Sequence, residues 1–351
     1  MTPAVPVRRA VARMRPYHPP LEGRAGKVRL DFNENPLGCS PEVRRALRQL
    51  TSAAVSMYPE QEVVRRKMGK FFGVSPEELL LTNGTDEALK LVVDTFVEPR
   101  GRVLLVEPTF AMYRFYSELA GARIHGLRYD AALQFPAKAV LESLRAGPQL
   151  FFLANPNSPI GSLLSLQELR RVLKAARQTM VVVDEAYFEF SGTTVLPWIG
   201  RHRNLIVTRT FSKAAGLAGL RLGCIFAHRE IAAHMRKAQS PYPVNVAALV
   251  AAEAAMHDRK FIDEARREVR RSQEELECGL TRLGVEFFPS AGNFVLVDLG
   301  DRAKWTVRVL AAKGFLLRDR SSDFGGKGYV RITLGTLQQT RRLLRHLEEI
   351  L

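Results

Sequence analysis

Short apolar runs alternate with longer amphipathic stretches from about residue 41 to residue 226. The apolar runs predict strands at 79–82, 103–106, 150–153, 180–183, 205–208 and 221–226. Stretches with helical spacing lie between several of them, for example at 86–96, 110–120 and 166–177. Because near-continuous apolar strands separated by helices need cover on both faces, the pattern predicts an α/β fold built on a large, mostly parallel sheet.

The C-terminal part of the chain shows a different order of elements. One long helix is predicted at 247–283, interrupted near His257 and Asp258. After it come apolar runs at 285–288, 293–298, 315–317 and 329–333, and helical stretches at 304–313 and 337–350. We therefore predict three parts, which are an N-terminal segment (1–40) over the small domain and the active site, a large domain (41–245) and a smaller α/β domain (246–351).

A strong positive charge is the main compositional feature. The chain has 351 residues and a formal net charge of +16, which would permit contact with nucleic acid or an anionic membrane. The basic residues are nevertheless spread in pairs, such as Arg266-Arg267 and Arg270-Arg271, with acidic residues near them. Solvated helix faces explain this spacing better, and anionic small molecules fit the charge equally well. We expect neither nucleic acid nor a membrane as a partner.

The cysteines bear on compartment and metal binding. Cys39, Cys224 and Cys278 lie far apart and form no C-x-x-C pair, which argues against a disulfide framework and against a metal site. No apolar run approaches the roughly 20 residues that span a bilayer. The first twenty residues carry arginines but no apolar core of a signal peptide. These features predict a protein of the reducing cytoplasm, without a bound metal.

Lys213 is the most informative residue. It follows the predicted strand at 205–208 and opens into a loop of small residues that ends at Arg221. Ser212, Lys213 and Arg221 could bring a hydroxyl, an amine and a guanidinium to one place. An amine condenses with an aldehyde while neighbouring donors hold a phosphate, so the segment indicates a phosphate-bearing aldehyde cofactor. A lone lysine here would be an ordinary surface charge, so the interpretation depends on other positions.

Three further candidate residues lie at or after the ends of predicted strands, at the edge of the sheet where α/β proteins bind ligands. Asp184 could hold a pyridine nitrogen in its protonated form, which would stabilise a carbanion on a bound substrate. Tyr187, three residues later, could donate to a phenolic oxygen of the same ring. Phe110 could stack on the ring face. Without the other positions, Asp184 would be explained as a residue that caps the next segment, and Phe110 as part of the hydrophobic core.

Three more segments carry candidate ligand contacts. The turn at 83–87 opens a helix whose free N–H groups suit a phosphate, although acidic residues there also complement any helix start. The turn-rich loop at 155–161 follows a strand and is therefore a candidate. Arg318 and Arg331, on neighbouring predicted strands, could converge on a carboxylate or a phosphate. Arg318 is equally well explained as a surface charge.

Taken together, these segments resemble the fold-type-I pyridoxal-5′-phosphate enzymes and, within them, the histidinol-phosphate aminotransferases. The resemblance runs from Arg15-Pro-Tyr17 nearly to the end of the chain. Its most specific pieces are Asp31-Phe-Asn-Glu-Asn-Pro-Leu-Gly38, Val183-Asp-Glu-Ala-Tyr187, Arg209-Thr-Phe-Ser-Lys213 with Gly216-Leu-Ala-Gly-Leu-Arg221, Pro241-Tyr-Pro-Val-Asn245 and Val330-Arg-Ile-Thr-Leu-Gly-Thr336. Five motifs in the right order make chance a poor explanation.

The resemblance implies a homodimer that uses pyridoxal 5′-phosphate to move an amino group between L-histidinol phosphate and 2-oxoglutarate in histidine biosynthesis. It places Lys213 on the cofactor aldehyde, Asp184 on the pyridine nitrogen and Tyr187 on the ring oxygen. Further cofactor contacts are implied for Thr85, Asp86, Phe110, Ser158, Thr210, Ser212 and Arg221, and for Tyr58 across the dimer. Substrate contacts are implied for Tyr17, Asn157, Arg318 and Arg331.

One position departs from the family. Asn-Pro-Thr-Gly is usual where this chain has Ser158-Pro-Ile-Gly161. The usual asparagine bonds the ring oxygen beside the tyrosine, and we expect the shorter Ser158 to reach that oxygen only through water. Asn157 points elsewhere unless the loop is rearranged. The change therefore bears on cofactor electronics and substrate choice.

Three alternatives stay open. A threonine-phosphate decarboxylase also reads a phosphate, but it tends to have Asn-Ile-Asn-Pro where this chain has Asn33-Glu-Asn-Pro36, and tryptophan in place of Tyr242. An aromatic or broad-specificity aminotransferase would share every motif except those of the variable substrate loops. A regulator that binds the cofactor without catalysis is disfavoured by the intact Lys213 and by the lack of a DNA-binding module.

Overall fold

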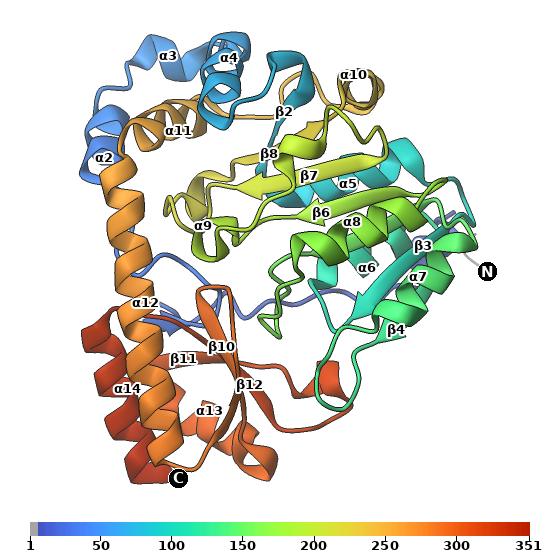
Figure 1. The fold of residues 1–351 in the computed structure, drawn as a ribbon. Helices are drawn as coiled ribbons and strands as arrows, with labels where there is room; N and C mark the ends of the chain where they lie inside the picture. The colour runs from blue at the N-terminus through green and yellow to red at the C-terminus, as the bar shows by residue number, and fades with distance from the viewer. Residues whose placement is uncertain (1–5) are drawn as a thin grey trace, which may run out of the picture.

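Two β-sheets organise the chain, and a long helix runs beside both (Figure 1). The computed structural model describes residues 6–351. The larger sheet is the mostly parallel one that the apolar pattern predicted, and the smaller sheet is mixed. The exact domain boundaries at residues 40 and 245 stay a prediction.

The larger sheet has seven strands. In spatial order they are β2 (Leu79–Thr82), β8 (Gly223–Ala227), β7 (Leu205–Thr210), β6 (Met180–Asp184), β5 (Leu150–Ala154), β3 (Arg102–Glu107) and β4 (Arg123–Arg128). Strand β8 runs antiparallel to both of its neighbours, whereas β7, β6, β5, β3 and β4 are mutually parallel. Strands β5, β7 and β8 are buried along their whole length, which is why they read as continuous apolar runs.

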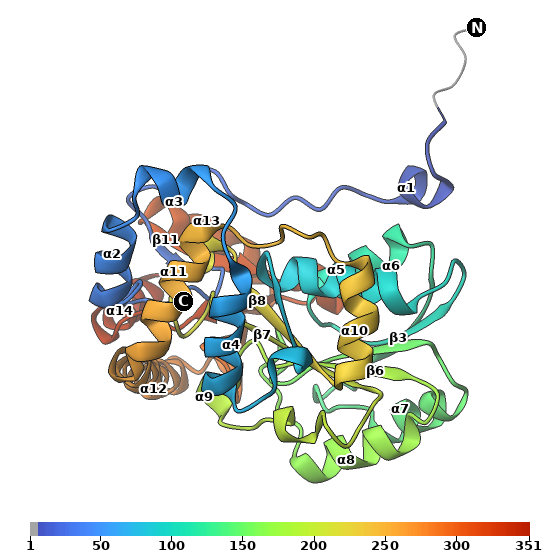
Figure 2. The same cartoon turned by 90° about the horizontal axis from the view of Figure 1, so that it is seen from above.

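Helices cover both faces of this sheet (Figure 2). One layer contains α5 (Gly84–Phe96), α6 (Ala111–Leu119) and α10 (Arg229–Ala238), and the other contains α7 (Ala137–Arg145) and α8 (Leu166–Ala175). Because side chains alternate along a strand, Val182 packs into the first layer while Val181 and Val183 pack into the second. Apolar packing on both faces of the sheet therefore holds in place the strand ends that carry the site.

The smaller sheet lies at the C-terminal end of the chain. In spatial order its strands are β1 (Val28–Leu30), β11 (Phe315–Asp319), β12 (Tyr329–Thr333), β10 (Phe294–Asp298) and β9 (Glu286–Phe288). Its helices are α12 (Arg259–Arg282), α13 (Ala303–Ala312) and α14 (Leu337–Ile350). Strand β1 pairs in parallel with β11, so part of the N-terminal segment (1–40) is a strand of this sheet.

The predicted break in the long helix lies at Asp258. Helix α11 (Val246–His257) ends there, and the Asp258 side chain accepts a hydrogen bond from the Phe261 N–H to cap α12. The remaining helices are α1 (Arg9–Arg13), α2 (Pro41–Arg48), α3 (Ser52–Ser56), α4 (Gln61–Phe72) and α9 (Phe188–Ser191). Short 3₁₀ turns lie at Pro76–Glu78, Leu196–Trp198, Ala218–Leu220, Gly300–Arg302 and Ser321–Phe324.

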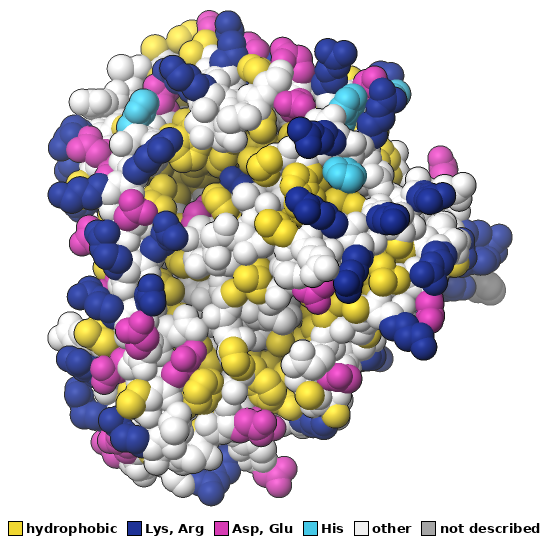
Figure 3. Space-filling view, viewed as in Figure 1, with side chains coloured by type: hydrophobic (Ala, Val, Ile, Leu, Met, Phe, Trp, Pro, Cys, Tyr) yellow, Lys and Arg dark blue, Asp and Glu magenta, His cyan; other side chains and the backbone are white. Residues whose placement is uncertain are grey.

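The positive charge is spread over the surface. Figure 3 shows Lys and Arg side chains around the rim of one face, with apolar and other side chains nearer its centre. Many of the arginines pair with acids one helical turn away, as Arg270 does with Glu274 and Arg271 with Glu268. Within residues 6–351, no helix is both long enough and apolar enough to cross a membrane.

A buried ion pair ties the N-terminal segment to the fold, and we expect its loss to reduce stability. The Arg24 guanidinium contacts both Asp31 carboxylate oxygens, Nη2 to Oδ1 at 3.0 Å, and both side chains are buried. Replacing Arg24 with methionine leaves a buried carboxylate unpaired, so the free energy of unfolding should fall by about 3 kcal/mol in urea titrations. Arg29→Met, which breaks an exposed pair with Glu34, should lower it by less than about 1 kcal/mol. Equal small losses would show that the buried pair does not anchor the segment.

Candidate active site

A cavity of about 120 Å³ lies at the carboxyl ends of strands β6 and β7. Its lining brings together nine predicted residues from separate segments, which are Thr85, Asp86, Phe110, Ser158, Asp184, Tyr187, Thr210, Lys213 and Arg221. The carboxyl end of a parallel sheet is the place where such folds bind ligands. The structure thus groups the residues that the sequence predicted as a site.

The two strands that carry Asp184 and Lys213 are tied together beside the cavity. Arg209 at the end of β7 donates to Glu185 Oε2 from Nε at 3.0 Å and from Nη2 at 2.8 Å, and both side chains are buried. The guanidinium also lies over the Phe188 ring, 3.5 Å from its centroid. A two-bond guanidinium–carboxylate contact is geometrically specific, so it fixes the strand ends relative to each other.

Lys213 points its amine at the N-terminal segment. Its Nζ donates to the Phe32 carbonyl oxygen at 2.8 Å, and the side chain is partly buried. Burial lowers the pKa of Lys213 below its ordinary value; attraction to the Tyr187 phenol opposes this shift and repulsion from Arg331 adds to it. A lysine of lowered pKa is neutral more often, which is the state that attacks a carbonyl or accepts a proton.

Asp184 is held by a residue that the sequence reasoning missed. Its Oδ2 accepts from the Tyr113 hydroxyl at 2.7 Å and its Oδ1 from the Ala186 N–H at 3.2 Å. Burial raises the pKa of Asp184 above its ordinary value in spite of these hydrogen bonds. Tyr113 is fully buried and stacks on Phe152, with ring centroids 4.8 Å apart. The available signal was spacing, because Tyr113 lies one helical turn after Phe110 and on the same side of α6.

One end of the cavity is built for an oxyanion. The buried Thr85 Oγ1 has no hydrogen-bond partner among the described residues. Arg221 Nη2 lies 2.8 Å from Asp86 Oδ2, which orients the guanidinium over the start of α5. Gly84 has a φ of +74°, and a Cβ there would collide with the Arg221 guanidinium. A free hydroxyl, a guanidinium and a helix N-terminus together fit a phosphate group.

The predicted pair of arginines lies opposite, on strands of the small sheet. Arg318 and Arg331 are direct neighbours across β11 and β12. Arg331 donates from Nη1 to Ser158 Oγ at 2.9 Å and from Nη2 to the Asp31 carbonyl at 2.6 Å. Burial lowers the pKa of Arg331 to about 10, so it stays a cation at neutral pH. Arg318 Nη2 lies 3.5 Å from the Tyr17 hydroxyl.

The sequence of the chain has matches among known proteins. The model of the family "aminotransferase class I and II" matches residues 25–347. This chain belongs to the class I and II aminotransferases. It is 37% identical to the histidinol-phosphate aminotransferase of Symbiobacterium thermophilum over 98% of each chain. It is 35% identical to that of Roseiflexus castenholzii, over 97% of this chain and 96% of the relative.

A solved structure agrees with this assignment. The histidinol-phosphate aminotransferase of Sinorhizobium meliloti in complex with pyridoxal-5′-phosphate superposes on this chain with a TM-score of 0.84 and 25% identity, covering 92% of this chain and 90% of the other. The aminotransferase described here therefore shares both the family sequence pattern and the family fold.

Not every predicted residue of this aminotransferase reaches the cavity. Asn157 is turned away, because its Nδ2 donates to Thr109 Oγ1 at 3.1 Å and its Oδ1 accepts from the Ile160 N–H at 3.4 Å. These contacts shape the loop, and the substrate contact of Asn157 stays a prediction. Ser212 is buried and lines a neighbouring hollow, and its N–H donates to Thr210 Oγ1 at 3.0 Å.

Ser158 and Tyr58, two predicted cofactor contacts, pair with other side chains of the protein. Ser158 lines the cavity, and its hydroxyl accepts from Arg331 Nη1 at 2.9 Å. The expected reach toward the ring oxygen through water stays a prediction. Tyr58 is 77% exposed and stacks on Tyr242, with ring centroids 4.4 Å apart. Its ring lies outside the cavity of its own chain.

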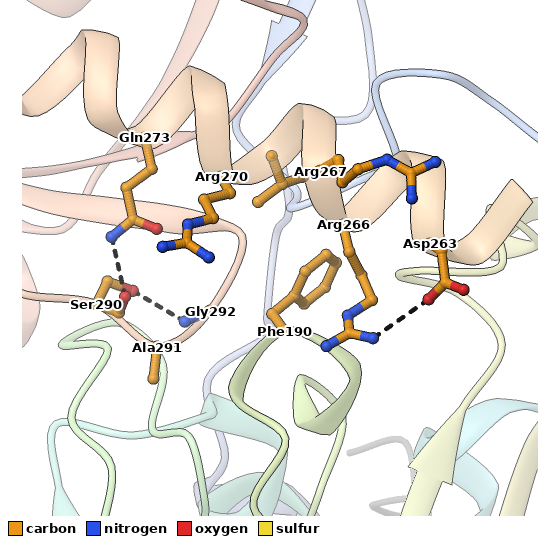
Figure 4. A pocket seen from close by; sticks show the side chains of 10 residues that line it. Phe190, Asp263, Arg266, Arg267, Arg270, Gln273, Ser290, Ala291 and Gly292 are labelled. Carbon is orange, nitrogen blue, oxygen red and sulfur yellow. Dashed lines mark hydrogen bonds and ion pairs between the residues drawn. The ribbon is translucent and has the colours of Figure 1, made fainter. Parts of the chain in front are cut away.

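The aminotransferase has a second, larger hollow of about 510 Å³ along α12 (Figure 4). In Figure 4 the side chains of Arg266 and Arg270 point from the helix toward Phe190 and the turn at 290–292. None of the predicted site residues lines it. Across residues 6–351 no group of His, Cys, Asp and Glu side chains is arranged to hold a metal ion.

Proposed function

We propose that this chain is a pyridoxal-phosphate-dependent aminotransferase that moves an amino group between L-histidinol phosphate and 2-oxoglutarate. The observation that carries the proposal is the convergence of an amine of lowered pKa, a buried carboxylate and an oxyanion end on one cavity. The relatives of this length and identity are named for the same reaction. When bound, the cofactor supplies an aldehyde for the amine and an electron sink for the substrate carbanion.

Each wall of the cavity matches one part of this cofactor. We assign the aldehyde to Lys213, the pyridine nitrogen to Asp184 and the ring oxygen to Tyr187, with Phe110 on the ring face. We assign the phosphate to the oxyanion end, made by Thr85, Thr210 and Arg221. Ser212, which lines the neighbouring hollow, stays a predicted phosphate contact. Asp86 acts through its ion pair with Arg221, because a carboxylate would repel a phosphate that it touched directly.

Lys213 also serves as the base. When neutral, its Nζ would be able to accept the proton released from the substrate carbon and to hold it beside the reacting atoms. Asp184, ionised beside a cation, keeps the ring electron-poor. Burial of both groups excludes water, which strengthens their electrostatic effect at this point.

The substrate's anionic end is assigned to Arg331 and Arg318, with Tyr17 beside them. L-Histidinol phosphate has no carboxylate, so the arginines take its phosphate in one half-reaction and the carboxylate of glutamate in the other. The two guanidiniums belong to residues paired across strands β11 and β12, so both can contact the same anionic group.

We also propose a homodimer of the cytoplasm. Val55, Met57, Tyr58 and Tyr242 are large side chains that are each more than half exposed, and Tyr58 stacks on Tyr242. A cluster of exposed apolar side chains is typical of an interface. In the proposed dimer, Tyr58 reaches the phosphate end of the neighbouring site. The described cysteines are all free thiols, which is consistent with a reducing compartment.

The deciding experiment mixes the protein and pyridoxal phosphate with L-histidinol phosphate and 2-oxoglutarate, and measures glutamate. Glutamate formation much faster than with phenylalanine or tyrosine as the donor supports the proposal. Activity with aromatic donors alone would move the function to a general aminotransferase. Release of carbon dioxide from threonine phosphate would instead support the decarboxylase.

Replacing Gly84 with alanine is expected to weaken cofactor binding by roughly 10- to 100-fold, the loss of about one charge-assisted hydrogen bond. The new Cβ would displace the Arg221 guanidinium from the phosphate end. Gly192→Ala is the matched control, because Gly192 also has a φ near +71° but faces open space. Dissociation constants from fluorescence titration of the apo-protein check both. Equal weakening in the two variants would assign the effect to backbone strain instead.

A further inference from the structure

Three consecutive residues, 31–33, leave strand β1 of the small sheet and cross to the cavity. Each of them contacts a different site residue. The Asp31 carbonyl accepts from Arg331 at 2.6 Å, the Phe32 carbonyl accepts from Lys213 at 2.8 Å, and Asn33 Nδ2 donates to the Tyr187 hydroxyl oxygen at 2.8 Å. Two of these contacts use the backbone and are open to any residue, whereas the third needs the Asn33 amide itself.

Asn33 is held so firmly that its amide has one orientation. The residue is 1% exposed and has a φ of +55°, a left-handed conformation that asparagine tolerates better than most residues. Its N–H donates to Thr333 Oγ1 at 2.9 Å, and the Thr333 hydroxyl donates back to Asn33 Oδ1 at 2.9 Å. Asn293 Nδ2 holds the Asn33 carbonyl at 3.1 Å. With Oδ1 occupied by Thr333, Nδ2 is the amide atom that faces Tyr187.

This orientation decides the role of the Tyr187 hydroxyl. An amide nitrogen can only donate, so the phenol oxygen of Tyr187 accepts from Asn33 and keeps its own proton available. Tyr187 lines the cavity, so that proton can be donated to a ligand oxygen there. The cationic groups that face the phenol are Lys213 and Arg331, and Tyr113 lies on the side of Asp184.

Ser158 also faces the Tyr187 phenol, and it differs from Asn33 because its hydroxyl is shared between that phenol and Arg331. Its hydroxyl accepts from Arg331 Nη1 at 2.9 Å, and the side chain is buried. The position at which the resembling family has an amide therefore carries a hydroxyl that contacts both Arg331 and the Tyr187 phenol in this chain. The carboxamide beside Tyr187 comes from Asn33, which is 154 residues away in the sequence.

We propose that Asn33 is a positioning residue that orients the Tyr187 phenol, and that it supplies the carboxamide N–H which Ser158 lacks. The effect on catalysis rests on the proposed function, since it acts through the cofactor oxygen assigned to Tyr187. The effect on the ionisation of Tyr187 is independent of the proposed function, since the Asn33–Tyr187 hydrogen bond is present in the protein without cofactor.

The first test is the ionisation of Tyr187 in the apo-protein, followed by ultraviolet difference absorption, with Tyr187→Phe to identify the signal. Asn33→Asp has the same shape but loses the donor, so the ionisation midpoint should rise by about one pH unit or more. Asn293→Ser is the control, because it removes an anchor of the Asn33 backbone and leaves the amide in place. No shift in Asn33→Asp, or an equal shift in Asn293→Ser, would overturn the proposal.

The second test asks whether an amide at position 158 replaces the one at position 33. The double variant Asn33→Asp with Ser158→Asn should recover at least half of the midpoint shift. With pyridoxal phosphate bound, Asn33→Asp should also shift the pH midpoint of the cofactor's visible absorption. It should lower kcat several-fold with little change in KM, because Asn33 does not touch the substrate. Absence of any recovery in the double variant would contradict the exchange of roles, whatever the substrate of the enzyme proves to be.

Discussion

Replacing Lys213 with alanine is expected to lower turnover by roughly 10⁴-fold, the upper end of what a positioned base contributes. The amine has two tasks in the proposed reaction, as the nucleophile toward the cofactor aldehyde and as the base at the substrate carbon. Alanine supplies neither, while the phosphate end and Asp184 are left in place. Initial rates of glutamate formation measure the loss, and cofactor titration should show that binding persists at reduced affinity.

The same substitution offers an internal check. A small primary amine added to the Lys213→Ala variant should restore part of the rate, because it can take up the proton in place of Nζ. Lys237→Ala removes an exposed lysine of α10 and should leave the rate unchanged. Full activity of Lys213→Ala without added amine would refute the assignment.

The pH profile follows from the charge of the same amine. Below its pKa, Lys213 is an ammonium and cannot accept a proton, so kcat should fall as the pH is lowered. Because burial lowers that pKa, the fall should begin nearer neutral pH than it would for an exposed lysine.

The strands that could be predicted from the sequence are the buried ones. Strands β5 and β7 have no exposed position, so their apolar runs are unbroken. Strand β4 was missed because it lies at the sheet edge, and its mostly exposed residues include two arginines and a histidine. Strand β1 was missed because three residues are too short for any periodicity. In both cases pairing with a neighbour, and not the local sequence, makes the strand.

The candidate site was predictable where side chains follow a strand end. Asp184 and Lys213 are in that position, and the parallel sheet brings them together. Tyr113 and Asn33 were missed because their partners lie 71 and 154 residues away, in contacts that only the tertiary structure creates. The Phe32 carbonyl that holds Lys213 has no signature at all, since every residue has a carbonyl.

Replacing Asp184 with asparagine is expected to lower kcat/KM by about 10²- to 10³-fold, the usual effect of removing one buried electrostatic contact from a reacting centre. Asparagine has nearly the same shape: its Oδ1 can still accept from the Ala186 N–H, and its Nδ2 can donate to the Tyr113 hydroxyl oxygen. The charge that keeps a bound pyridine nitrogen protonated is lost, so the ring withdraws fewer electrons. Asp94→Asn, which neutralises an exposed acid of α5, should leave kcat/KM unchanged.

The stability of the apo-protein distinguishes an electronic role of Asp184 from a structural one. Burial raises the pKa of Asp184 in the folded state, so its contribution to stability is present below the unfolded pKa and is lost as the pH rises through the folded pKa. At neutral pH the ionised carboxylate therefore destabilises the apo-protein, and Asp184→Asn should unfold at an equal or higher urea concentration than the wild type. The advantage should shrink at acidic pH, where the wild-type group is also neutral. An apo-variant that is less stable at neutral pH would mean that the charge at Asp184 holds the fold together, and the loss of activity would then say nothing about the cofactor.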